Sequence, residues 1–316
     1  MTTSRDRRQI VTAAAEPQGG VMSRAMLRAL GADRNVVSRE VSADRWQLHG
    51  QQTVAVHTLP LGDVGLRWRA IWEVGLGVAT LDGVSALAAA GTRGFDENVV
   101  HVSVPRAVHH APVSGVRIHR VARLTDERVG IGVPRTRPAV AAIRAASWAV
   151  SDRQAALLLA LPVQQRVIDG SHLQTANSRL SVRRRERLIA QLVRDIADGA
   201  QSLGELDFAR LCRRRKLPPP DRQVIRRTTR GRVYLDVRWS DVGLVVEIDG
   251  SGHRVGLAVT DDNLRQNRVT LLGDIVLRID LVGLRVEANA FLDQICEAHA
   301  FLMSRIAAPL MVANAR

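Results

Sequence analysis

Three carboxylates in the C-terminal third of this 316-residue chain have a spacing that suits a metal site. Asp236 lies in one apolar segment, and Glu247 and Asp249 lie at the end of the next. Residues two apart on a strand project from the same face, so Glu247 and Asp249 face one way while Ile248 faces the other. Such carboxylates repel one another and are costly to desolvate. Mg²⁺ or Mn²⁺ would supply the opposing charge and activate water against a phosphate ester, so the pattern predicts a metal-dependent hydrolytic site.

Arginines near these carboxylates allow a second interpretation. Arg238, Arg265 and Arg268 could neutralise the carboxylates by ion pairing, without a metal ion. Arg265 and Arg268 lie on a helix predicted for residues 261–272, where they could also hold a scissile phosphate. The residues alone leave both roles open.

Two strands joined by a turn must position the carboxylates. The first strand is predicted at residues 232–239 and the second at residues 242–250, with a turn at Ser240-Asp241 between them. This hairpin would bring Asp236 toward the two acidic residues of the second strand. The expected result is a single acidic site.

The first 60 residues predict helices followed by a β-hairpin. The predicted elements are helices at residues 5–16, 24–30 and 34–42 and short strands at residues 46–48 and 53–57. Ser23 and Asp33 are the expected N-caps of the second and third helices. This order is the layout of a winged helix-turn-helix, in which the third helix can enter the major groove of DNA while the hairpin touches the backbone.

The third of these helices has polar sides that could contact DNA. Arg34, Asn35, Ser38 and Arg39 lie on those sides and are the predicted nucleic-acid-binding residues. A small helical subdomain used for packing or for protein contacts is the alternative.

The middle of the chain predicts a mixture of helices and strands. The predicted elements are two helices within residues 65–90, strands at residues 99–105 and 116–121, an alanine-rich helix at residues 139–160 and a basic helix at residues 179–199. Asp82 is the expected cap of the second helix. In the basic helix, Leu188, Leu192 and Ile196 share one face, and the charged side could face DNA or be solvated.

The charge of the chain favours a polyanionic partner. The net charge is +14, and residues 179–238 contain 17 Arg or Lys and 7 Asp or Glu, which accounts for +10 of it. Arginines that neutralise phosphates release condensed counterions, so nucleic acid is the first candidate and an anionic membrane a distant second. A general arginine bias is the alternative, because Lys216 is the only lysine.

Cysteine usage and hydropathy point to the cytoplasm. Cys212 and Cys296 lack the C-x-x-C spacing of a zinc or redox site, which fits a reducing compartment. The N-terminal residues carry no apolar signal segment, and no apolar run of about 18 residues occurs. We therefore expect no export and no membrane association.

Short blocks in the C-terminal third carry a family resemblance. The blocks are Gly204-Glu205, Leu217-Pro218-Pro219-Pro220, Tyr234-Leu235-Asp236-Val237, Val245-Val246-Glu247-Ile248-Asp249-Gly250, His253, Asp262, Arg265, Leu272-Gly273 and Val276-Leu277-Arg278. In order and spacing they resemble the widespread bacterial domain of unknown function related to the very-short-patch repair endonuclease. The resemblance implies a restriction-endonuclease-like fold, which is a mixed central sheet flanked by helices.

The same resemblance implies roles for individual residues. Asp236 and Glu247 match the metal-binding carboxylates, and Glu205 matches the acidic residue of the first helix. Restriction-type nucleases usually carry a lysine two residues after the glutamate, where this chain has Asp249. The repair endonuclease also lacks that lysine and uses histidine chemistry, so His253 is the candidate general acid or base. The alternative is that His253 has no catalytic role.

Motifs in the N-terminal half resemble a second family. They are Trp46-Gln47-Leu48-His49-Gly50, His101-Val102-Ser103-Val104-Pro105-Arg106 and Val116-Arg117-Ile118-His119-Arg120. They are similar to those of the abortive-infection type IV antitoxin proteins of actinobacteria, which implies a DNA-binding, autorepressing module. Gln51-Gln52-Thr53 replaces the more usual sequence of the wing.

These observations predict a cytoplasmic α+β multidomain protein that binds DNA. The predicted parts are a winged helix-turn-helix at residues 1–60, an α+β middle domain at 61–175, a basic helical linker at 176–202 and an α/β restriction-endonuclease-like domain with a mixed central sheet at 203–316. The expected activity is Mg²⁺- or Mn²⁺-dependent endonuclease cleavage of DNA in repair or defence. The alternative is a non-catalytic, antitoxin-like transcriptional regulator. A toxin partner and a homodimer are both left open.

Overall fold

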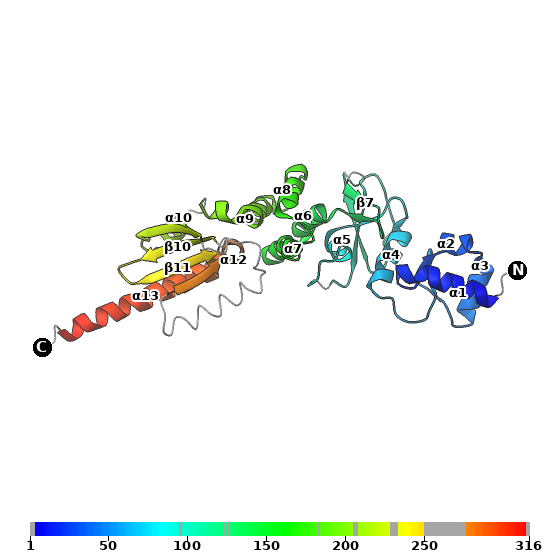
Figure 1. The fold of residues 1–316 in the computed structure, drawn as a ribbon, viewed down its shortest axis with the longest axis horizontal. Helices are drawn as coiled ribbons and strands as arrows, with labels where there is room; N and C mark the ends of the chain where they lie inside the picture. The colour runs from blue at the N-terminus through cyan, green and yellow to red at the C-terminus, as the bar shows by residue number, and fades with distance from the viewer. Residues whose placement is uncertain are drawn as a thin grey trace. The chain divides into compact units, whose positions relative to one another are not determined.

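The computed structural model contains two compact units, Met1–Ala141 and Ala142–Arg316. It describes residues 4–94, 97–122, 124, 127–182, 184–204, 208–227, 233–249 and 276–313. Each unit combines helices with β-sheet (Figure 1), in line with the α+β class predicted. The boundary lies within helix α6 (Pro138–Trp148).

The first unit begins with short helices and a small sheet. Its first elements are α1 (Ser4–Ala15), the 3₁₀ helix η1 (Glu16–Gln18), β1 (Val21–Ser23), α2 (Arg24–Ala29), α3 (Arg34–Ser42), β2 (Gln47–Leu48) and β3 (Thr53–Ala55). The strands are antiparallel in the order β1-β3-β2. The predicted helices and hairpin are thus confirmed as elements, whereas β1 was not predicted.

Side-chain caps and a shared apolar core explain why these elements form. Ser23 Oγ accepts a hydrogen bond from Met26 N at 3.2 Å, which caps α2. Asp33 Oδ1 accepts one from Val36 N at 2.9 Å, which caps α3, so both predicted caps are confirmed. The core beneath the helices contains Val11, Ala15, Met22, Leu27, Ala32, Val37, Trp46 and Val54.

The remainder of the first unit is a mixed sheet with two helices. Its elements are α4 (Asp63–Val74), β4 (Thr80–Leu81), α5 (Gly83–Ala89), β5 (Val100–Pro105), β6 (Val116–Val121), β7 (Arg128–Val129) and β8 (Arg135–Thr136). The sheet order is β6-β5-β4-β8-β7, with parallel pairing of β5 to β6 and of β4 to β8. Asp82 Oδ1 accepts a hydrogen bond from Gly83 N at 2.7 Å, so the cap predicted for α5 is confirmed.

The second unit begins with helices, and two predicted boundaries are wrong. The elements after α6 are α7 (Asp152–Gln164), α8 (Gly170–Arg179) and α9 (Glu186–Gly204). The single helix predicted at residues 139–160 is interrupted, because Ser151 Oγ accepts a hydrogen bond from Gln154 N at 3.1 Å and starts α7. The basic helix predicted from Arg179 begins instead at Glu186, after α8 has ended.

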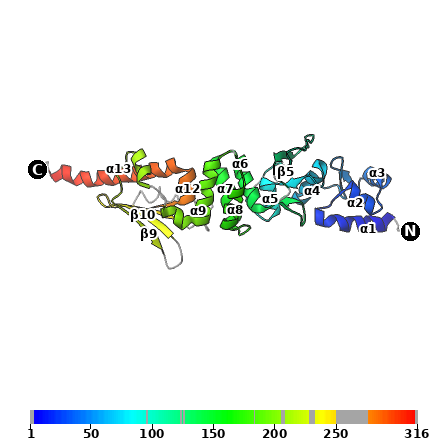
Figure 2. The ribbon, with the colours of Figure 1, turned by 90° about the horizontal axis from the view of Figure 1, so that it is seen from above.

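A four-stranded mixed sheet forms the second part of this unit. Its elements are α10 (Phe208–Arg214), β9 (Arg222–Arg227), β10 (Val233–Trp239), β11 (Leu244–Asp249), β12 (Val276–Asp280), α12 (Leu281–Val286) and α13 (Ala288–Ala313). The order is β12-β11-β10-β9, with β11 and β12 parallel and the other pairs antiparallel. Helix α13 runs along this sheet (Figure 2). Within the residues described, no helix is both long enough and apolar enough to cross a membrane.

A buried ion pair joins α9 to α12. Asp195 is 2% exposed, and its Oδ2 accepts a hydrogen bond from Arg285 Nε at 2.8 Å. Replacing Asp195 with alanine would leave a largely buried guanidinium without this partner, so we expect the free energy of unfolding to fall by about 3 to 5 kcal/mol. Urea denaturation followed by circular dichroism measures this loss.

Asp152 provides the matched control for that measurement. Its Oδ1 lies 2.7 Å from Arg185 Nε, but its side chain is 62% exposed. Solvent screens this exposed carboxylate, and Arg185, which is 16% exposed, keeps its hydrogen bond to Ala149 O at 2.7 Å, so Asp152→Ala should change stability little. Equal losses for the two variants would contradict the assignment of Asp195–Arg285 as a stabilising buried pair.

Candidate functional site

The predicted acidic residues lie on neighbouring strands of the β9–β12 sheet. In the antiparallel pair of β10 and β11, Asp236 is paired with Glu247, and Tyr234 is paired with Asp249. Paired positions share a face of a sheet, so the backbone register assigns Asp236, Glu247 and Asp249 to one face. The predicted hairpin, with its turn after Trp239, is confirmed.

The opposite face of this sheet is a hydrophobic core. Its buried strand residues are Leu235, Val237, Trp239, Leu244, Val246, Ile248, Leu277 and Ile279. They pack with Phe208 of α10 and with Phe291 and Ile295 of α13. Ile248 has no exposed surface, as predicted, while Glu247 and Asp249 on either side of it are half-buried. Strand alternation therefore separates an apolar core face from a carboxylate face, which holds Asp236, Glu247 and Asp249.

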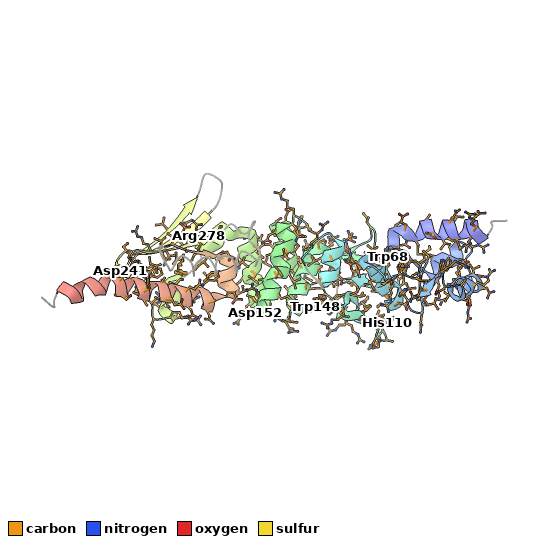
Figure 3. All side chains as sticks on the ribbon, turned by 90° about the horizontal axis from the view of Figure 1, so that it is seen from below. Trp68, His110, Trp148, Asp152, Asp241 and Arg278 are labelled. Atoms are coloured by element: carbon orange, nitrogen blue, oxygen red, sulfur yellow. The ribbon has the colours of Figure 1, made fainter. Side chains whose placement is uncertain are left out.

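Glu247 pairs with an arginine from a distant part of the chain. Arg278 of β12 is its register partner, and Arg278 Nε donates a hydrogen bond to Glu247 Oε2 at 3.2 Å. The two side chains are 64% and 32% exposed, so solvent screens much of their attraction. Figure 3 labels Arg278 on this sheet. Ion pairing of a carboxylate, the second interpretation of the sequence, therefore holds for Glu247, with a partner that was not predicted.

A further carboxylate at this end of the sheet, Asp280, has a structural role. It is paired in register with Asp249 and is 3% exposed. Its Oδ1 accepts a hydrogen bond from Gly283 N at 2.6 Å and caps α12. Sequence reasoning missed Asp280, although an aspartate directly before an apolar helix is a recognisable N-cap signal.

Four predicted site residues, Glu205, His253, Arg265 and Arg268, lie outside the described residues. Among those that the structure does describe, no group of three or more His, Cys, Asp or Glu side chains could hold a metal ion. Burial raises the pKa of the Cys212 thiol to about 12. This thiol therefore stays protonated near neutral pH, a form that neither binds metals nor attacks a substrate well.

The outer side of α3 is a second candidate surface. Arg34, Asn35, Ser38 and Arg39 are all exposed, as their predicted positions require. Val37 lies on the buried side and packs into the core of the first unit. An exposed helix face with two guanidinium groups and two short polar side chains offers donors to phosphates and to base edges.

The turn between β2 and β3 is held by a carboxylate from α4. Glu73 accepts hydrogen bonds from Gln51 N and Gln52 N, both at 2.9 Å, and from Thr53 Oγ1 at 2.7 Å. The approach is so close that a Cβ at Gly50 would lie 2.3 Å from the Glu73 carboxyl carbon. Sequence reasoning did not single out Glu73, because nothing local to the hairpin indicates a partner from the next helix.

Comparison with known proteins assigns no family to the chain. No family model matches it, and no curated protein matches it. Its function is therefore inferred from its residues and their geometry.

Proposed function

We propose that the chain is a DNA-binding protein whose C-terminal sheet carries a metal-dependent endodeoxyribonuclease site. The observation that carries the proposal is the register of β10 and β11, which pairs Asp236 with Glu247 and assigns Asp249 to the same face. The core occupies the opposite face, and the half-buried Glu247 and Asp249 are not part of it. The strand order β12-β11-β10-β9 with one parallel pair is in keeping with the restriction-endonuclease-like fold that the resemblance implies.

The described donors fit a hard divalent cation. Glu247 and Asp249 are half-buried carboxylates on one strand face, and Mg²⁺ and Mn²⁺ prefer such oxygen ligands. A carboxylate has two oxygens, so Glu247 can bind Arg278 through Oε2 and a cation through Oε1. Asp236 and Glu247 would hold the ion, which when bound would supply a Lewis acid for the scissile phosphate and lower the pKa of the attacking water.

Other residues of the chain would complete the reaction. His253, as a neutral imidazole, would take the proton from the attacking water. Asp249 would add negative charge to the carboxylate face, and Glu205 would extend the acidic site. Arg265 and Arg268 would hold the scissile phosphate through charge-assisted hydrogen bonds.

DNA binding by the N-terminal residues would deliver this site to its substrate. The elements α1 to β3 suit a winged helix-turn-helix, in which α3 enters the major groove and the β2–β3 hairpin is the wing. The exposed polar side of α3 and the excess of arginine in residues 179–238 both support a polyanionic partner.

DNA cleavage by the purified protein tests the proposal. Supercoiled, mismatched and single-stranded DNA are incubated with the protein and its Glu247→Ala variant in Mg²⁺ or Mn²⁺, with single-stranded RNA in parallel. We expect nicked or linear DNA from the parent protein alone. If the parent cuts none of these DNAs yet binds them in a salt-sensitive way, the nuclease proposal is rejected.

A non-catalytic regulator is the second candidate function. It is favoured by the ion pair of Glu247 with Arg278, which neutralises the carboxylate without a metal ion. The aspartate at position 249, in place of the lysine of restriction-type nucleases, also favours it. A regulator would bind its own promoter tightly and would bind no Mn²⁺ in calorimetry.

A further inference from the structure

The turn between β2 and β3 has the geometry of an anion-binding site. The consecutive backbone N–H groups of Gln51 and Gln52 donate to the two different oxygens of one carboxylate, that of Glu73, at 2.9 Å each. Thr53 Oγ1 donates to one of these oxygens at 2.7 Å. Successive N–H groups that converge in this way form concavities that bind phosphate in many proteins.

Positive charge lies beside these donors. Arg24 Nε donates to Gln51 O at 2.7 Å, and Arg69 Nε donates to His49 O at 2.6 Å. Burial lowers the pKa of His49, and the charge of Arg69 lowers it further, so the imidazole is neutral near pH 7. Two guanidinium groups therefore bind carbonyl oxygens of the turn, while the N–H groups of the turn converge on one anion, which in this structure is the Glu73 carboxylate.

We propose that this turn binds one phosphodiester group of the DNA backbone, and that the Glu73 carboxylate occupies the same place in the free protein. The inference rests on the proposed function, in which the β2–β3 hairpin is the wing of a DNA-binding domain. A phosphodiester has two non-bridging anionic oxygens, as a carboxylate has two. It can therefore accept the hydrogen bonds of Gln51, Gln52 and Thr53 once Glu73 turns away.

The position of Glu73 makes it a competitor rather than a part of the wing. It belongs to α4, whose residues Asp63–Val74 follow the hairpin in the chain. Gln51 and Gln52 are exposed, so solvent reaches two of the three donors of the turn, while the third, Thr53, is buried. Each DNA contact at the turn must displace Glu73, and the affinity of the protein for DNA is lowered by that competition.

DNA affinity of the Glu73→Gln variant tests the inference. Glutamine keeps the size of the side chain but removes the charge that competes with phosphate. We expect this variant to bind a short duplex roughly threefold to tenfold more tightly, with the same slope of log K against log salt, because the complex contains the same number of phosphate contacts as that of the parent. Fluorescence anisotropy over a salt series measures both quantities, and thermal unfolding verifies the fold.

Asp63→Asn is the matched control. It removes the same charge from the same helix, but the Asp63 side chain is 84% exposed and pairs with Arg67 instead of with the turn. This variant should bind DNA as the parent does. Adding Thr53→Val to Glu73→Gln should reverse part of the gain, because a donor of the site is then missing.

The outcomes separate this inference from DNA binding itself. Unchanged or weaker binding by a folded Glu73→Gln protein would overturn the phosphate site while leaving the DNA-binding proposal intact. If the parent and every variant fail to bind DNA, both are rejected. If Glu73→Gln does not fold, Glu73→Asp is measured in its place. Aspartate is one methylene shorter, so its carboxylate lies farther from the turn, and this variant should also bind DNA more tightly than the parent.

Discussion

Replacing Asp236 with alanine is expected to abolish DNA cleavage while leaving DNA affinity unchanged. Asp236 is the register partner of Glu247, so the variant loses one of the two carboxylates proposed to hold the metal ion. We expect the rate to fall by more than about 100-fold, since loss of a residue that merely supports a metal ligand already costs up to that factor. Nicking of supercoiled plasmid in Mn²⁺ measures the rate, and anisotropy measures binding.

Asp241→Ala is the control for this experiment. Asp241 lies in the turn of the same hairpin and is exposed. Its Oδ1 accepts a hydrogen bond from the backbone N–H of its neighbour Val242 at 2.9 Å. Figure 3 labels it at this turn. Its removal should leave cleavage near the parent rate. Cleavage retained by Asp236→Ala would remove Asp236 from the proposed site, and an equal loss in Asp241→Ala would point to damage of the hairpin.

Replacing Trp239 with alanine should cause a large loss of stability in the second unit. Trp239 ends β10, is 1% exposed, and stacks edge-on against Phe208 and His299. Its indole Nε1 also donates a hydrogen bond to Pro218 O at 2.9 Å. The cavity and the lost bond together should lower the free energy of unfolding by about 3 to 5 kcal/mol. Urea denaturation followed by circular dichroism measures the change.

Trp239→Phe separates packing from the hydrogen bond. Phenylalanine fills most of the same space but cannot donate to Pro218 O, so this variant should lose clearly less stability than Trp239→Ala. If Trp239→Ala were as stable as the parent, the proposed role of Trp239 in holding the core face would be wrong.

Local sequence is sufficient to predict the hairpin that carries the carboxylates. Apolar residues alternate with charged ones at the end of β11, and this period places Ile248 in the core and Glu247 and Asp249 on the other face. The polar pair Ser240-Asp241 marks the turn. All of these signals act over a few residues, which is the range that sequence patterns describe well.

The partners of these residues depend on contacts far along the chain. Arg278 meets Glu247 only because β12 pairs in parallel with β11, and parallel strands need a long crossover whose register no local pattern specifies. Glu73 reaches Gln51 and Gln52 in the same way, from another element. Such pairs follow from tertiary packing, so sequence reasoning identified the carboxylates but not what binds them.

The helix boundary within the alanine-rich sequence was missed, although the serine that caps the second helix is a local signal of the kind used to predict the caps Ser23 and Asp33. Nearly every residue between Pro138 and Gln164 favours a helix, and the break is set by one serine that caps the second helix. Ser151 competes with continued helix formation through its own hydroxyl. A single hydrogen bond of this kind decides between one helix and two.

The separation of the core face from the carboxylate face has an evolutionary consequence. Positions 247 and 249 are not part of the core that holds the sheet together, so mutation can alter them without unfolding the protein. A lineage can therefore gain or lose cleavage by a few point substitutions while its architecture persists. A nuclease and a non-catalytic repressor would then differ by only a few substitutions on one fold. Shared ancestry would therefore not tell which of the two functions a given descendant has.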